Sequence, residues 1–464
     1  MPRSLAATAE MPESRLHRWL GSNRRDRKAE VDGFAVALLP LAWIEVGPRR
    51  ISRSTAEIAV VDGRSMTDRG GWICGGRYYR WLGTKWLLAG FLEITGARKV
   101  ILNRPKKLNT LNYEMLRKMY QKLKEYENDI TVKLIILKAN GKVFCAGGDL
   151  TSAYIFVGLG HWSFGTSYYR KGFCLDYLLA TYKKPSLAIL DGHVMGGGVG
   201  ISIHSTFRIV TENTVFAMPE VLIGLFPDVG ASHFLSRLPG FFGEYIGLTG
   251  ARLNGVEMLA FGLGTHFIPS KKVKAMENSL ENLAASSDSL NIASMSMVIN
   301  KFAEEVHLKP DSAYSRLDMV NQCFSGETCE EILSSLEHLA QKVEAKWVHE
   351  AISSMKSANP LGLKIFLKTI REGRSKNFKQ CLETEYVGIS HLLGRTIGNN
   401  FYEGSRAMLI DKDKKPQWVP SKLEDVTDEM VAKCLSKSFG DDDDWLPLQL
   451  PSRSKKTDVV ASKL

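Results

Sequence analysis

One segment, residues 187–198, constrains the fold more than any other part of this 464-residue chain. An apolar run from Leu187 to Leu190 stops at Asp191 and Gly192, and three consecutive glycines, 196–198, precede a new apolar stretch. This pattern predicts a buried strand, a sharp turn and a helix. Glycines in such a turn let a ligand approach the backbone, and the free N–H groups at a helix start suit a developing oxyanion. Tight packing of the strand on the helix, without a ligand, would use the same glycines.

A second strand followed by glycines lies earlier in the chain. Residues 133–138 predict a buried strand because the apolar run 134–137 lies between two lysines, and the sequence FCAGGD, residues 144–149, follows it. Its glycines are Gly147 and Gly148. Two units of this kind can each direct one backbone N–H at the same carbonyl oxygen. Repeated short strands with turns and helices between them predict an α/β fold built as a spiral of β–β–α turns.

Two carboxylates follow in loops rich in apolar residues, glycine and proline. Glu220 ends the sequence FAMPE at 216–220, and Asp228 lies in GLFPDVG at 224–230. Apolar surroundings raise a carboxyl pKa by desolvation, so each residue is a candidate acid or base. The alternative is that both carboxylates cap helices.

Together these motifs resemble those of the crotonase, or enoyl-CoA hydratase/isomerase, superfamily. FCAGGD at 144–149 and HVMGGGVG at 193–200 carry the resemblance, and FAMPEVLIGLFPDVG at 216–230 is typical of the 3-hydroxyisobutyryl-CoA hydrolase branch. The similarity extends from about Ile101 to about Phe439 and includes the run FYEGSRAMLIDKD at 401–413. It implies a crotonase-like spiral with a helical C-terminal region.

The resemblance also implies roles for four residues. The N–H groups of Gly148 and Gly197 would form the oxyanion hole for an acyl-CoA thioester, and Glu220 matches the family's catalytic glutamate. Asp228 matches the branch's substrate-contacting and catalytic aspartate. The implied reaction is hydrolysis of 3-hydroxyisobutyryl-CoA to 3-hydroxyisobutyrate and CoA, a step of valine catabolism. No separate cofactor is expected, because CoA is part of the substrate.

Two positions depart from the pattern of the superfamily. Hydratases carry a second glutamate where this chain has Gly200, and its absence favours hydrolysis, which needs one activated water or one nucleophile. Family members place an acidic or amide residue that touches substrate where this chain has Gly172. Two alternatives therefore stay open: an enoyl-CoA hydratase or isomerase, disfavoured by Gly200, and a catalytically silent acyl-CoA-binding protein, suggested by Gly172.

Charge and hydropathy limit which binding partners this chain can have. The net charge is +11, but residues 1–92 hold 15 Lys and Arg against 9 Asp and Glu, whereas residues 93–445 hold 42 against 40. Because the excess lies at the ends, no nucleic-acid groove is expected. The apolar run from Phe34 to Ile44 is too short to span a bilayer and contains Pro40, so no membrane partner is expected. In the basic turn after Asn103, Arg104, Lys106 and Lys107 are either partners of CoA phosphates or a solvated surface.

Cysteine and histidine spacings point away from other chemistries. The seven cysteines form no CxxC pair, which indicates a reducing compartment, and no spacing of histidines or cysteines supports a metal site. A GxSxG motif is absent from the sequence. Cys145 has no accompanying base motif and is interpreted as a core residue, and His266 as structural.

The sequence predicts four segments. Residues 1–92 are an unmatched, disordered extension, 93–275 the crotonase-like core, 276–445 a helical region and 446–464 a disordered tail. Only residues 99–102 look like a strand of the family's N-terminal hairpin, so we expect the first part of the sheet to be incomplete. The tail ends in SKL, residues 462–464, which predicts a peroxisomal import receptor as partner and a peroxisomal rather than mitochondrial location. A homo-oligomer is compatible with the sequence.

Overall fold

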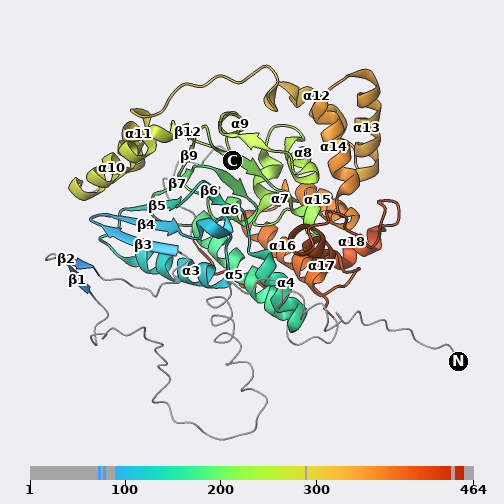
Figure 1. The fold of residues 1–464 in the computed structure, drawn as a ribbon, viewed down its shortest axis with the longest axis horizontal. Helices are drawn as coiled ribbons and strands as arrows, with labels where there is room; N and C mark the ends of the chain where they lie inside the picture. Colours follow the sequence, from blue (N-terminus) through green and yellow to red (C-terminus); the bar gives the residue numbers. More distant parts are fainter. Residues whose placement is uncertain (1–71, 75–76, 80–88, 288–289, 440–444, 454–464) are drawn as a thin grey trace, which may run out of the picture. The chain divides into compact units, whose positions relative to one another are not determined.

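The computed structural model describes residues 72–74, 77–79, 89–287, 290–439 and 445–453 (Figure 1). Contacts divide the chain into residues 1–82 and 83–464. In the first unit, β1 (Trp72–Cys74) and β2 (Arg77–Tyr79) pair antiparallel. The second unit contains the two sheets and the helices that position the site.

A six-stranded sheet forms the larger layer of the second unit. Its order is β12-β9-β7-β5-β4-β3, and all pairs are parallel except β3 with β4. The strands are β3 (Ala89–Ile94), β4 (Ala97–Leu102), β5 (Leu134–Ala139), β7 (Ser186–Leu190), β9 (Phe207–Val210) and β12 (His266–Phe267).

A four-stranded sheet has the order β11-β10-β8-β6, with only β10 and β11 antiparallel. Its strands are β6 (Val143–Cys145), β8 (His193–Met195), β10 (Val215–Ala217) and β11 (Leu253–Asn254). The pairs β5 and β6, β7 and β8, and β9 and β10 each contribute one strand to the large sheet and the next strand to the small one. Successive turns of the chain therefore stack as a spiral, which confirms the predicted α/β crotonase-like fold.

The large sheet is buried on both faces. Leu134 and Ile136 pack with Met276 and Leu280 of helix α10 (Ser270–Ser286), whereas Ile135 and the other alternate side chains belong to the main core. Side chains of a strand alternate between the two faces, so a continuous apolar run is what a doubly covered parallel sheet requires. This explains why residues 134–137 are apolar without alternation.

The expectation of an incomplete first hairpin is wrong. Strand β3 pairs with β4 over its whole length, from Ala89 opposite Leu102 to Ile94 opposite Ala97. Gly96 has φ +74°, which suits the tight turn between the strands. Most side chains of β3 are half-buried or exposed, as expected for an edge strand, so its apolar residues show no clean alternation between buried and exposed positions. The last residues of the expected extension 1–92 thus belong to the core sheet.

Helices α3 (Tyr113–Asn128) and α5 (Ser163–Ala180) pack against each other. The Asn112 side chain caps α3 by accepting a hydrogen bond from the Met115 N–H at 2.9 Å. The other helical elements before α10 are short. They are η1 (Pro105–Lys107), α4 (Leu150–Leu159), α6 (Gly197–Gly200), η2 (Glu220–Ile223), α7 (Ala231–Phe234), η3 (Leu235–Arg237), α8 (Phe242–Thr249) and α9 (Gly255–Ala260).

The C-terminal region is helical, as predicted (Figure 1). Helix α16 packs on α5, α15 on α7 and α8, and α17 on α4 and η2, so this region covers the elements that carry the site. Its members after α10 are α11 (Ile292–Asn300), η4 (Tyr314–Arg316), α12 (Leu317–Phe324), α13 (Cys329–Lys342), α14 (Lys346–Ser357), α15 (Pro360–Gly373), α16 (Phe378–Leu393), α17 (Asn400–Ser405), η5 (Arg406–Ile410) and α18 (Asp428–Cys434).

The expectation of a disordered tail is wrong for residues 446–453. Leu448 and Leu450 are buried, and the Lys379 Nζ donates to the Leu450 carbonyl at 3.0 Å. Arg453 forms an ion pair with Glu127 of α3. The two buried leucines and the hydrogen bond to the Leu450 carbonyl therefore hold this extended segment in place. Its sequence has no periodicity that would predict a helix or a strand. The SKL ending lies outside the described residues.

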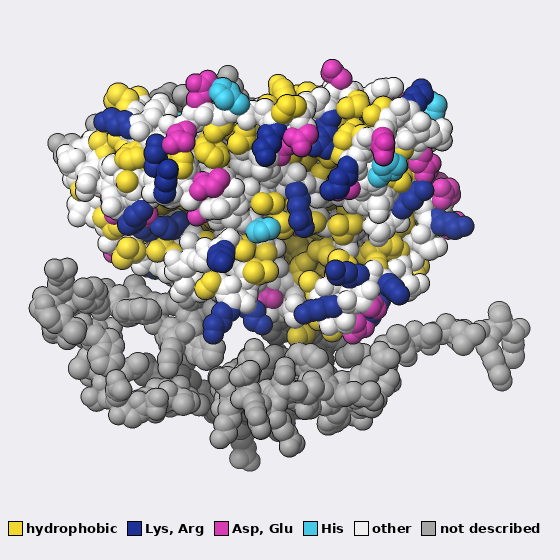
Figure 2. All heavy atoms as spheres, turned by 45° about the horizontal axis from the view of Figure 1, so that its top comes forward, with side chains coloured by type: hydrophobic (Ala, Val, Ile, Leu, Met, Phe, Trp, Pro, Cys, Tyr) yellow, Lys and Arg dark blue, Asp and Glu magenta, His cyan; other side chains and the backbone are white. Residues whose placement is uncertain are grey.

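Acidic and basic side chains are interspersed on the face shown in Figure 2. This distribution agrees with the near-neutral balance of residues 93–445. In the described part of the chain, no helix is both long and apolar enough to cross a membrane.

Candidate active site

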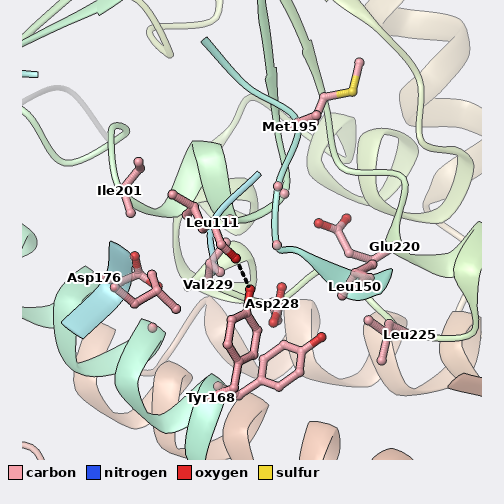
Figure 3. Close-up of a pocket in the computed structure, with 18 of the residues that line it drawn as sticks. Leu111, Leu150, Tyr168, Asp176, Met195, Ile201, Glu220, Leu225, Asp228 and Val229 are labelled. Atoms are coloured by element: carbon pink, nitrogen blue, oxygen red, sulfur yellow. Dashed lines mark hydrogen bonds between the residues drawn. The ribbon is translucent and has the colours of Figure 1, made fainter. Parts of the chain in front are cut away.

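Three neighbouring strands of the small sheet end at the same edge. Strand β8 pairs in parallel with both β6 and β10, with Val194 opposite Cys145 and Met195 opposite Ala217. Parallel strands present their C-terminal ends on one side. The glycine turn after β6, the glycine turn after β8 and the loop with Glu220 after β10 therefore converge on one pocket (Figure 3).

The two glycine turns lie against each other. A Cβ built on Gly197 would lie 3.5 Å from the Gly148 nitrogen. Gly147 and Gly196 have φ of +102° and +48°, which only glycine adopts without strain. Among the hydrogen bonds of the described residues, none uses the N–H of Gly148 or Gly197 as donor. These two unpaired N–H groups on the pocket wall can serve as the two hydrogen-bond donors of an oxyanion hole.

The turn after β6 is held in place by backbone pairing and by an ion pair. The Leu111 N–H donates to the Gly147 carbonyl, and the Asp149 N–H donates to the Leu111 carbonyl, both at 2.8 Å. Arg104 Nη1 lies 2.8 Å from Asp149 Oδ2, and both side chains are only 11% exposed. Arg104 therefore supports the turn from within the protein, whereas Lys106 and Lys107 are exposed. The ion pair favours a structural role for Arg104, and contact of this basic turn with CoA phosphates stays a prediction.

Glu220 is a buried carboxyl in contact with the second glycine turn. A Cβ on Gly196 would lie 2.7 Å from Glu220 Oε1, so a side chain at position 196 would displace the carboxyl. Glu220 Oε2 is buried and has no hydrogen-bond partner among the described residues. Burial raises the pKa of Glu220 to about 8, and the charge of Glu385 adds to this rise, while a backbone hydrogen bond offsets part of it. Near neutral pH this carboxyl can both hold and accept a proton.

Asp228 lies in a loop that helix α16 fixes. Glu385 of that helix accepts from the Gly230 N–H at 2.6 Å and from the Ser232 N–H at 2.9 Å. Burial, followed by the charges of Glu220 and Glu385, raises the pKa of Asp228 well above its ordinary value. Val229 has φ +54°, an unfavourable conformation for a β-branched residue. The loop is therefore held in a strained conformation next to Asp228.

Sequence reasoning missed two carboxyls, Asp176 and Glu385. Asp176 lies on α5, is 2% exposed and lines the pocket with Glu220 and Asp228 (Figure 3). The available signal was a charged residue between the apolar residues Phe173 and Tyr177. No signal pointed to Glu385, whose role depends on where α16 docks.

The structure explains the departure from the family pattern at Gly200 but not the one at Gly172. A Cβ on Gly200 would lie 2.6 Å from Val229 Cβ and 3.0 Å from Asp176 Oδ1, so position 200 has no room for a glutamate. At Gly172 the situation is opposite, because a Cβ there would meet only Leu116 Cδ1, at 3.8 Å. Gly172 lines the pocket and leaves one wall open.

The other candidate residues lie apart from this chemistry. Cys145 is fully buried under the second glycine turn, and burial raises the pKa of its thiol to about 12. A protonated thiol is a poor nucleophile, which favours the interpretation as a core residue. His266 is not among the residues that line the pocket. Its Nδ1 lies 3.0 Å from Thr265 Oγ1. Within the described ranges, no three His, Cys, Asp or Glu side chains are arranged to hold a metal ion.

The spiral fold with two glycine turns facing a buried carboxyl defines a protein of the crotonase class. A family model described as "Enoyl-CoA hydratase/isomerase" matches residues 97–435. In solved structures, the chain is similar to a carnitinyl-CoA dehydratase from Mycobacterium thermoresistibile. The TM-score is 0.69 and the identity 28%, over 78% of this chain and 98% of that one.

Curated relatives narrow the assignment. The chain is 46% identical to 3-hydroxyisobutyryl-CoA hydrolase 1 of Arabidopsis thaliana, over 80% of this chain and 96% of the relative. It is 40% identical to the mitochondrial 3-hydroxyisobutyryl-CoA hydrolase of Gallus gallus, over 75% and 88%. It is also 36% identical to the small ribosomal subunit protein mS47 of Arabidopsis thaliana, over 78% and 87%. The chain therefore belongs to the enoyl-CoA hydratase/isomerase family, in its 3-hydroxyisobutyryl-CoA hydrolase branch.

Proposed function

We propose that this protein hydrolyses the thioester of 3-hydroxyisobutyryl-CoA, releasing 3-hydroxyisobutyrate and CoA. One observation carries the proposal: two unpaired glycine N–H groups and the buried carboxyl of Glu220 surround one pocket, while Gly200 leaves no room for the second glutamate of hydratases. The names of the relatives support the same substrate. We propose that the reaction is a step of valine breakdown.

In this mechanism the thioester oxygen lies between the N–H groups of Gly148 and Gly197. Each donor stabilises the tetrahedral transition state by about 3 kcal/mol. Glu220 takes a proton from water while the water oxygen bonds to the acyl carbon, and the C–S bond then breaks. Alternatively, the Glu220 carboxylate attacks the acyl carbon, CoA leaves as a thiolate, and water hydrolyses the resulting anhydride. Both routes consume one water molecule and require no cofactor besides the CoA of the substrate.

Asp228 has a second task in this mechanism. Its raised pKa favours the protonated carboxyl, which can supply a proton to the leaving thiolate. The strained loop and the contacts of Glu385 keep this carboxyl beside the pocket.

The test measures release of free thiol from 3-hydroxyisobutyryl-CoA, with loss of the enoyl absorbance of crotonyl-CoA measured in parallel. We expect thiol release without hydration, and loss of thiol release in Glu220→Gln. The matched control is Glu350→Gln, an exposed carboxyl on α14, which should be unchanged. Hydration of crotonyl-CoA would instead indicate a hydratase.

A non-enzymatic role is the second candidate. It is favoured by Gly172, which replaces a substrate-touching residue, and by the similarity to a ribosomal subunit protein. CoA binding without turnover of either substrate would support this role and contradict the hydrolase.

We further propose that the SKL ending directs the protein to peroxisomes through the import receptor, although the Gallus gallus relative is named mitochondrial. A fluorescent protein fused ahead of the chain should show punctate peroxisomal signal, and deletion of residues 462–464 should abolish it. Mitochondrial signal from either fusion would contradict the proposal.

A further inference from the structure

Asp176 is a buried carboxyl that the proposed mechanism does not use. It lies in α5 four residues before the last residue, Ala180, far from the helix N-terminus that a carboxylate could cap, and its side chain lines the pocket. Within the described chain, no hydrogen bond or ion pair involves its carboxyl, although the residue is 2% exposed. Its oxygens are not among the fully enclosed, unpartnered polar atoms of the described residues, so they face the space of the pocket. No contact within the described protein therefore explains the position of this carboxyl.

The position of Asp176 can be compared with that of Gly172, where this chain lacks the acidic or amide residue of its family. Gly172 and Asp176 are four residues apart on α5 and line the same pocket, so they lie on one face of the helix. Gly172 leaves its wall open, whereas the Asp176 carboxyl reaches the opposite end of that face, beside Gly200 and Val229. The polar group on this helix is thus displaced by about 6 Å along the axis.

We propose that Asp176 is the substrate-positioning residue of this pocket and binds the hydroxyl group of a 3-hydroxyacyl-CoA, in place of a side chain at Gly172. The proposal rests on the proposed hydrolase function and names the group that selects its substrate. Burial, followed by the charge of Glu385, raises the pKa of Asp176 well above its ordinary value. A protonated carboxyl both donates to and accepts from a hydroxyl. Asp228 is then left free for proton transfer.

The assay compares two thioesters that differ only in the hydroxyl group, 3-hydroxyisobutyryl-CoA and isobutyryl-CoA. In Asp176→Leu we expect kcat/KM to fall about 10- to 100-fold for the hydroxylated substrate and to change little for isobutyryl-CoA. Asp176→Asn keeps the shape and a hydrogen-bonding group, so it should retain most of the preference. Because Asn is isosteric, it also provides a folded variant if Leu disturbs α5.

A rescue variant tests the displacement itself. The open wall at Gly172 has room for a longer side chain, so Gly172→Glu combined with Asp176→Leu should recover part of the lost preference. Equal losses on both substrates, or an unchanged preference in both Asp176 variants, would overturn the proposal. Absence of thiol release by the unmodified protein from either substrate would instead contradict the hydrolase function.

Discussion

Replacing Glu220 with glutamine removes the charge of a buried carboxyl and keeps its shape. Glu220 is 6% exposed, and burial raises its pKa from an ordinary value of 4.5 to about 8. A carboxyl with a raised folded-state pKa binds its proton more tightly in the folded protein than in the unfolded chain. Its contribution to stability is therefore complete below pH 4.5 and is lost as the pH rises toward 8.

The size of the effect follows from the pKa. Each pH unit between 4.5 and 8 lowers the free energy of unfolding by about 1.4 kcal/mol, so the loss at pH 7 is about 3 kcal/mol. Glutamine does not titrate. Glu220→Gln should therefore have lost its activity and yet be more stable than the unmodified protein at pH 7, with the difference vanishing near pH 4.5. The change also removes one of the charges that raise the pKa of Asp228.

The assay is urea unfolding of both proteins at several pH values between 4.5 and 8, with Glu350→Gln as an exposed control. Thiol release measured over the same range should rise with pH in the unmodified protein, because Glu220 acts as base or nucleophile only when deprotonated. Parallel stability curves for the two proteins would refute the raised pKa, and near-normal activity of Glu220→Gln would refute its assignment to the chemistry.

Three further variants test the site. In Gly200→Glu the new Cβ would overlap Val229, so we expect the variant to be less stable by about 1–3 kcal/mol in urea unfolding and not to hydrate crotonyl-CoA. A stable variant that hydrates crotonyl-CoA would contradict this expectation. Arg104→Gln removes the ion-pair partner of Asp149, so we expect the free energy of unfolding in urea to fall by about 3 kcal/mol and kcat to fall as well. Unchanged kcat and stability would show that the ion pair does not hold the glycine turn. Cys145→Ala should retain thiol release within a few-fold, since its thiol is buried and protonated; complete loss in a folded variant would make Cys145 a nucleophile.

Local patterns determined the elements of this protein and their special residues. Glycines at 147 and 196 are required by backbone conformation, and the apolar loops around Glu220 and Asp228 already predict perturbed carboxyls. The Asn112 cap and the apolar face of α3 were likewise readable from the sequence. Such features depend on neighbours within one turn of helix or one strand, so short-range periodicity reveals them.

Only the tertiary structure decided which of these elements meet. The pairing of β6, β8 and β10 aligns three turns at one sheet edge, and the packing of α5 and α16 brings Asp176 and Glu385 to the carboxyls of the pocket. Strand β3 and the buried tail residues were missed for the same reason, because their partners lie elsewhere in the chain. Strand order and helix docking are fixed by contacts between segments that are distant in the sequence. Such contacts leave no pattern in the sequence around either contacting segment.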